Sequence, residues 1–154
     1  MTNALTKTTN QRHIAVLRIL AGAPLLAFGV MHITGALPMK PLVQAAGLPM
    51  PDITAMVTPP MMILAGILLV IGAFARIGAV IAIGTMLGAV MTHIKIPSDG
   101  WPIPVEGAPH ANPYIPMMVM AIAIILFSAY VIFKGAGPWS IDGKCCCQAP
   151  SDNA

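Results

Sequence analysis

The sequence predicts an all-α fold, an integral membrane four-helix bundle, from three observations. Hydrophobic residues make up 57% of the 154-residue chain and charged residues only 8%, whereas a soluble domain of this length needs a charged surface. Four apolar stretches have the roughly 20 residues needed to cross a bilayer, namely residues 13–37, 53–75, 77–96 and 114–133. Backbone amides in lipid must bond within their own segment, and the alternating polarity of barrel strands is absent, so we expect helices.

We expect one transmembrane domain over residues 13–134, between a polar N-terminal tail (1–12) and a C-terminal tail (135–154). Both tails are too short to bury a core of their own. A cleaved signal peptide is the alternative interpretation of the first stretch, because it has a basic start, an apolar middle and small residues at its end. The length of the stretch, and the presence of Pro24 and His32 within it, favour a retained helix.

The connections between the stretches predict how the helices are ordered. Residues 41–46 predict a short interfacial helix that ends at Gly47. The turn before Arg76 is very short, so the second and third helices are expected to be antiparallel neighbours. Six prolines between residues 97 and 116 predict a stiff cap over one mouth of the bundle.

A stripe of small residues runs along the third stretch, where Gly84, Gly88 and Thr92 are spaced four apart. Such a stripe allows the backbone of another helix to approach closely. The alternative is that glycine is simply common in membrane helices.

The basic residues predict the orientation of the chain. Most lie at the start of the first stretch, between the second and third, or after the fourth (Lys7, Arg12, Arg18, Arg76, Lys134 and Lys144), and only Lys40 and Lys95 lie on the other side. Since cytoplasmic loops carry the excess of Lys and Arg, both termini are expected to be cytoplasmic. Arg18 and Arg76 are interpreted as boundary residues that reach lipid headgroups. The net charge is only +3 and no basic cluster with aromatic residues occurs, which argues against nucleic-acid binding.

This orientation places three of the four histidines, His32, His93 and His110, at the outer face. All methionines except Met1 and Met86 lie in the outer loops or outer halves of the stretches. Ionisable groups inside a membrane are costly, so His32 and His93 are candidate ligand-binding residues, with Met62 and Met91 as adaptable apolar lining. The alternative is that each histidine only bonds a loop carbonyl near the interface.

Several chemistries suit these side chains. A histidine can hydrogen-bond a quinone carbonyl, relay a proton or ligate a metal. Histidine with methionine suits copper and also axial ligation of haem, with His110 as a further metal candidate. None of the nucleophile-elbow, phosphate-loop, dinucleotide-binding or zinc-protease motifs occurs, so catalytic residues are not assigned. Carboxylates are absent from the interiors of the four stretches, which argues against a transporter that relies on them for proton coupling.

Three consecutive cysteines, Cys145, Cys146 and Cys147, lie in the C-terminal tail. A cytoplasmic tail is in a reducing compartment, so we expect free thiols rather than a disulfide. A soft-metal handle or a thiol redox contact is the alternative.

Short motifs in a fixed order resemble the DoxX-like membrane proteins over about residues 14 to 142. They are Arg18-Ile-Leu with Gly29 and His32, then Ala46-Gly47-Leu48-Pro49, then Gly66 with Gly72 and Arg76, then Met86-Leu-Gly-Ala-Val with His93, and Gly137-Pro-Trp-Ser140-Ile-Asp142. The resemblance implies a four-helix membrane bundle, and we expect a bacterial or archaeal cytoplasmic membrane. Members include a subunit of thiosulfate:quinone oxidoreductase, and others are linked to redox and thiol-stress complexes.

The chain departs from the family pattern at one position. Many members carry a glutamate four residues before the glycine that matches Gly66, and here that residue is Met62. This weakens a proton-handling role and favours an accessory one. Three hypotheses follow: a quinone- or thiol-linked redox subunit with an outer-face site, a structural or assembly subunit of a larger membrane complex, and a copper or haem protein.

Overall fold

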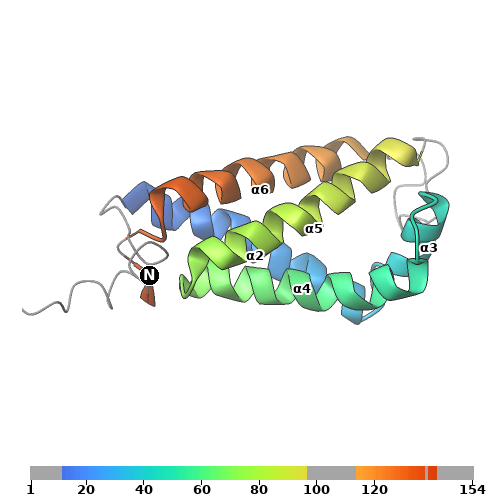
Figure 1. Cartoon of the computed structure of the whole chain (residues 1–154), viewed down its shortest axis with the longest axis horizontal. Coiled ribbons are helices and arrows are strands. Elements are labelled where there is room, and N and C mark those ends of the chain that lie inside the picture. The colour runs from blue at the N-terminus through green and yellow to red at the C-terminus, as the bar shows by residue number, and fades with distance from the viewer. Residues whose placement is uncertain (1–11, 97–113, 138, 142–154) are drawn as a thin grey trace, which may run out of the picture.

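The computed structural model describes residues 12–96, 114–137 and 139–141, and the regular structure of these residues is entirely helical. Four long helices form an elongated bundle, with one short helix at one end (Figure 1). The helices are α2 (Arg12–Ile33), α3 (Met39–Ala45), α4 (Pro51–Ile71), α5 (Ala75–Lys95) and α6 (Tyr114–Lys134). All but α3 are long and apolar enough to cross a membrane. The predicted all-α bundle with four membrane helices is therefore confirmed.

Two of the long helices end earlier than the hydropathy predicts. The first apolar stretch continues to residue 37, but α2 ends at Ile33 and Gly35 follows with a φ of +78°. The second continues to residue 75, but α4 ends at Ile71 because Gly72, with a φ of +73°, caps it and donates its N–H to the Leu68 carbonyl at 2.9 Å. Apolar composition therefore indicates which segments can lie in the membrane, whereas a glycine with a positive φ follows the last residue of both α2 and α4 closely.

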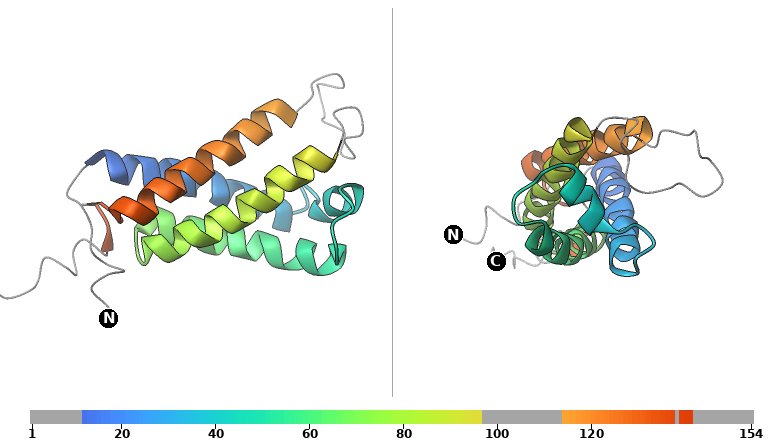
Figure 2. Two further views of the ribbon diagram at one scale, coloured as in Figure 1. Left: turned by 45° about the horizontal axis from the view of Figure 1, so that its top comes forward. Right: turned by 90° about the vertical axis from the view of Figure 1, so that its right-hand side faces the viewer.

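The two ends of the bundle differ in what closes them. At the terminal end, where α2 begins and α6 ends, His13 Nε2 and the Tyr130 hydroxyl lie 3.0 Å apart. At the opposite end, which we call the α3 end, α3 packs across α4 and α5 (Figure 2). The short helix predicted over 41–46 is confirmed by α3, and the three-residue turn between α4 and α5 confirms that these helices are antiparallel neighbours.

The buried faces of the bundle consist mostly of small residues. The core includes Ala21, Ala65, Ala79, Ala82 and Ala121, while large apolar side chains such as Val80 and Leu126 are exposed on the outside. This arrangement suits a helix in lipid, because the outer face must be as apolar as the inner one and only close packing holds the helices together.

Glycines bring α2 and α4 together, and they are not those of the predicted stripe. A Cβ added at Gly66 would lie 2.9 Å from the Gly22 carbonyl oxygen, and one at Gly22 would lie 2.9 Å from Leu69 Cβ. Both distances are shorter than normal packing allows. Gly84 and Gly88, in contrast, are exposed, and a Cβ on either would meet no atom of the described chain within 4 Å. No described helix of this chain approaches Gly84 or Gly88 closely, whereas Thr92, the third member of the stripe, is buried.

Arg18 is buried at the terminal end, so its side chain does not reach lipid headgroups as expected, while its role in setting the topology stays a prediction. Its side chain is 1% exposed, and Nη2 donates a hydrogen bond to the Trp139 carbonyl oxygen at 2.6 Å. The guanidinium lies where a Cβ of Gly72 would stand, so the absence of a side chain there makes room for it. The segment after α6 folds back over the end of the bundle and supplies the acceptor, which hydropathy cannot reveal. Arg76, at the start of α5, is half-buried.

Some predictions concern residues outside the described ranges. These are the proline-rich cap with His110, the N-terminal tail before Arg12, and the tail with Cys145, Cys146 and Cys147.

Candidate functional site

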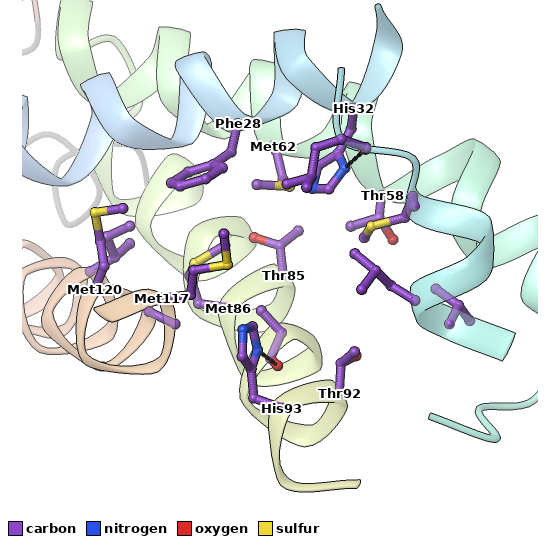
Figure 3. Close-up of a pocket in the computed structure, with 17 residues that line it drawn as sticks. Phe28, His32, Thr58, Met62, Thr85, Met86, Thr92, His93, Met117 and Met120 are labelled. Atoms are coloured by element: carbon purple, nitrogen blue, oxygen red, sulfur yellow. Dashed lines mark hydrogen bonds between the residues drawn. The ribbon is translucent and has the colours of Figure 1, made fainter. Parts of the chain in front are cut away.

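A cavity of about 90 Å³ lies inside the bundle toward the α3 end, and we call it the histidine cavity. Its volume is several times the ~10–15 Å³ that one water molecule needs. The last turns of α2, the first half of α4, the last half of α5, the first half of α6 and the α3 segment all line it. Most of its wall is apolar, and its polar residues are His32, Thr58, Thr85, Thr92 and His93 (Figure 3).

The two histidines come from different helices and are held in the same way. His32 lies near the end of α2, and its Nδ1 is 2.6 Å from the Leu37 carbonyl oxygen in the following turn. His93 lies near the end of α5, is 8% exposed, and has Nδ1 2.7 Å from the Ala89 carbonyl oxygen of its own helix. A carbonyl oxygen can only accept, so Nδ1 donates in both rings and Nε2 is the acceptor atom of each neutral imidazole. The predicted bond to a loop carbonyl is confirmed for His32, and it determines the tautomer.

The threonine hydroxyls in the wall donate to their own helix. Thr85 Oγ1 donates to the carbonyl oxygens of Ile81 at 3.1 Å and Ala82 at 3.0 Å, and Thr92 Oγ1 donates to the Gly88 carbonyl oxygen at 2.9 Å. Both hydroxyl protons are therefore used within α5. Apart from Thr58 and the acceptor oxygens of these hydroxyls, the two imidazoles are the polar groups of the cavity wall.

Methionine sulfurs from several helices complete the wall. Met62 of α4 is 4% exposed and lies in the core of the bundle, beside His32 (Figure 3). The other methionines of the cavity are Met39, Met86, Met117 and Met120. Methionine is flexible and polarisable, so such a wall adapts to the shape of an apolar ligand.

The structure brings together three of the four residues predicted to bind a ligand. His32, His93 and Met62 line the cavity, but Met91 is 50% exposed and lies outside it. Met91 is two positions from His93 on α5, which puts it on a different side of the helix from the cavity face. Arg18 and Arg76 are at the terminal end, and Gly84 and Gly88 line a neighbouring hollow described below.

Sequence reasoning missed Phe28, Thr58 and Thr85, which also line the cavity. Phe28 is four residues before His32 on α2, and Thr58 is four residues before Met62 on α4. Residues four apart lie on one face of a helix. Extending each predicted site residue by one turn toward the N-terminus would have found both.

Few side chains near the cavity could bind a metal ion. Among the described residues, no group of three or more His, Cys, Asp or Glu side chains is placed to hold a metal ion. A copper or haem site would therefore need methionine beside His32 and His93. Both possibilities stay predictions, which elemental analysis and an absorption spectrum of the purified protein will test.

Comparison with known proteins identifies one family. A family model described as DoxX matches residues 13–94, just over half of the chain. The match includes both histidines of the cavity and runs from the start of α2 almost to the end of α5. No curated protein and no solved structure matches the chain.

Proposed function

Because this chain belongs to the DoxX family and has four helices able to span a membrane, we propose that its histidine cavity binds a quinone. In this proposal the chain is the quinone-linked subunit of a membrane redox complex. The resemblance to a family that includes a thiosulfate:quinone oxidoreductase subunit supports it. A thiol-linked variant of the same role rests on that resemblance alone.

The observation that carries the proposal is the pair of imidazoles with a common tautomer in an apolar cavity. Ligand sites are typically apolar with a few convergent polar groups. Oxidation of a quinol breaks two O–H bonds and releases two protons and two electrons. Because Nδ1 of His32 and of His93 donates to a backbone carbonyl, Nε2 is the ring atom of each that can accept one of the two protons. The electrons pass to an oxidised redox centre of a partner subunit, and quinone reduction follows the reverse course.

We further propose that the α3 end of the bundle faces outward from a bacterial or archaeal cytoplasmic membrane. Arg12, Arg76 and Lys134 lie at helix ends on the terminal end, whereas Lys40 and Lys95 lie at the α3 end. Cytoplasmic ends carry the excess of basic residues. The histidine cavity would then lie in the outer half of the membrane.

The test is to measure quinone content and quinol binding of the purified protein in nanodiscs. Wild type is expected to retain quinone after mild-detergent purification. His32→Asn and His93→Asn are the variants, because the Asn amide nitrogen can replace the Nδ1 donor while Nε2 is removed. Each is expected to weaken quinol binding about tenfold, since the hydrogen bond that a quinol hydroxyl donates to Nε2 in an apolar site is worth ~1–1.5 kcal/mol.

His13→Asn is the matched control, because His13 lies at the terminal end, far along the chain from either cavity histidine, and pairs with Tyr130. Equal quinol binding by wild type, both cavity variants and the control would reject the site. Loss of binding in all three variants would indicate a general loss of folding, which the melting temperature in detergent will reveal.

The second candidate is a structural or assembly subunit without chemistry of its own. Met62 favours it. At this buried position in the cavity wall, the family resemblance implies a glutamate in many members, and a methionine cannot take up or release a proton. Mass spectrometry of proteins that co-purify in mild detergent will test this role. It predicts partner subunits whose association is unchanged by His32→Asn and His93→Asn. A stable, partner-free protein that turns over quinol would contradict it.

A further inference from the structure

A second hollow adjoins the histidine cavity on the side between α4 and α5. It has a volume of about 330 Å³, and we call it the α4–α5 groove. The two helices meet in a tight turn at the terminal end and diverge toward the α3 end, where α3 packs against both (Figure 2). The residues around the groove are Met39, Val43, Leu48, Thr54, Val57, Thr58, Met61, Ile81, Gly84, Thr85, Gly88, Ala89 and Thr92.

The groove and the cavity are neighbours that share part of their lining. Met39, Val43, Thr58, Thr85, Ala89 and Thr92 line both of them. Since α4 and α5 are membrane helices, the outer side of the groove faces lipid, where Val57 is about half exposed. A lateral route from the cavity to the bilayer would therefore run between these two helices.

Gly84 and Gly88 keep this route open. Both are exposed on α5, and a Cβ at either would meet no atom of the described chain within 4 Å. At Gly22 and Gly66 on the α2–α4 side, the same Cβ would lie within 3.0 Å of the neighbouring helix. On the α2–α4 side, the neighbouring helix therefore occupies the space beside each glycine. On the α4–α5 side, the space beside each glycine is open.

The groove differs from the cavity in having no histidine in its lining. No charged residue of the described chain lines the groove, and the Thr85 and Thr92 hydroxyls donate to their own helix. The imidazoles of His32 and His93 line only the inner cavity. A polar ring is thus accommodated inside, and an apolar chain is accommodated between the helices.

We infer that the ligand of the histidine cavity carries a long apolar tail, which passes through the α4–α5 groove past Gly84 and Gly88 into the bilayer. The groove is also the entrance for the ligand. This inference rests on the proposed quinone site, and it adds the tail, its path and the residues that keep the path open. It makes Gly84 and Gly88 determinants of specificity for tailed over tailless ligands.

The test compares two quinones with the same ring, each supplied in its reduced quinol form, one with a long isoprenoid tail and one with a methyl group in its place. Binding of each is measured with wild type, Gly84→Ala, Gly84→Leu and Gly88→Leu in nanodiscs. The leucine variants are expected to bind the tailed quinone about tenfold or more weakly, because their side chains overfill the groove. Gly84→Ala is expected to stay within about twofold of wild type, since its methyl group meets open space. Binding of the tailless quinone is expected to be unchanged throughout.

Ala27→Leu is the matched control, because Ala27 is exposed on α2 and lines neither hollow. Equal loss of both quinones in the leucine variants would overturn the inference, because the cavity itself would then be affected. Unchanged binding of the tailed quinone would also overturn it, and a change only in oligomeric state would assign the stripe to contact with a second copy. If wild type binds neither quinone, the proposed function fails before the groove is tested.

Discussion

Arg18 shows how one residue can be misread when only its place in the sequence is known. An arginine near either boundary of an apolar stretch can usually reach lipid headgroups with its long side chain. Here the guanidinium is buried and bonds the Trp139 carbonyl oxygen, in space that Gly72 leaves open. A buried cation is stable only when its donors are satisfied, so the surrounding residues are constrained by it.

The fit between Arg18 and Gly72 leads to a prediction that separates steric overlap from backbone strain. Gly72→Ala is expected to destabilise the protein by more than ~3 kcal/mol, because alanine pays about 1–2 kcal/mol for a positive φ and its Cβ also overlaps the guanidinium. Gly35 has a similar φ of +78° but open space around it. Gly35→Ala is therefore expected to cost only ~1 kcal/mol. Unfolding free energies in detergent will measure both, and equal losses would contradict the role of Arg18.

For each long helix, the face that packs against other helices is identified by the small size of its residues and not by its hydropathy. All four long helices are apolar on every side, so the buried side is distinguished by alanine and glycine. The two glycine sets of this chain have opposite environments. Gly22 and Gly66 lie at the contact of α2 with α4, and Gly84 and Gly88 face the α4–α5 groove.

The difference between the glycine sets predicts opposite effects of the same substitution. Gly66→Ala is expected to destabilise the protein by ~1–3 kcal/mol, because its Cβ would lie 2.6 Å from Leu26 Cγ and 2.9 Å from the Gly22 carbonyl. Gly84→Ala adds a methyl group to open space and gains helix propensity, so no loss of stability is expected. Thermal unfolding in the same detergent compares the two. A loss at Gly84 as large as at Gly66 would mean that another helix occupies the groove.

For the whole molecule, the two ends of the bundle have different roles. The terminal end is closed by the buried Arg18 and the segment after α6, and the α3 end holds the histidine cavity and the groove. The Lys40–Asp52 ion pair, at 2.7 Å, links α3 to the start of α4 there. Both side chains are exposed, so the pair contributes little to stability.

The distribution of basic residues predicts the orientation of this asymmetric bundle. A fluorescent protein fused after the C-terminus is expected to be bright in a bacterial host, and a periplasmic phosphatase fused there is expected to be inactive, because the basic end stays in the cytoplasm. The opposite pattern would place the cavity on the cytoplasmic side. In that case the outer-face part of the proposed function would be wrong, although the quinone site itself would be unaffected.

Length, hydropathy and turn residues are local properties, and the amino-acid sequence alone therefore predicted four membrane-length helices, the short α3 and the antiparallel pairing of α4 with α5. It also placed His32, His93 and Met62 at one level of the bundle. The arrangement of the helices in space was needed to learn that Met91 lies outside the cavity, that Arg18 is buried, and which glycines pack against a neighbouring helix. This is because a helix surrounded by lipid is apolar on its outer face as well as on its packed face. Packing then depends on how side-chain sizes match between helices, and no single segment contains that information.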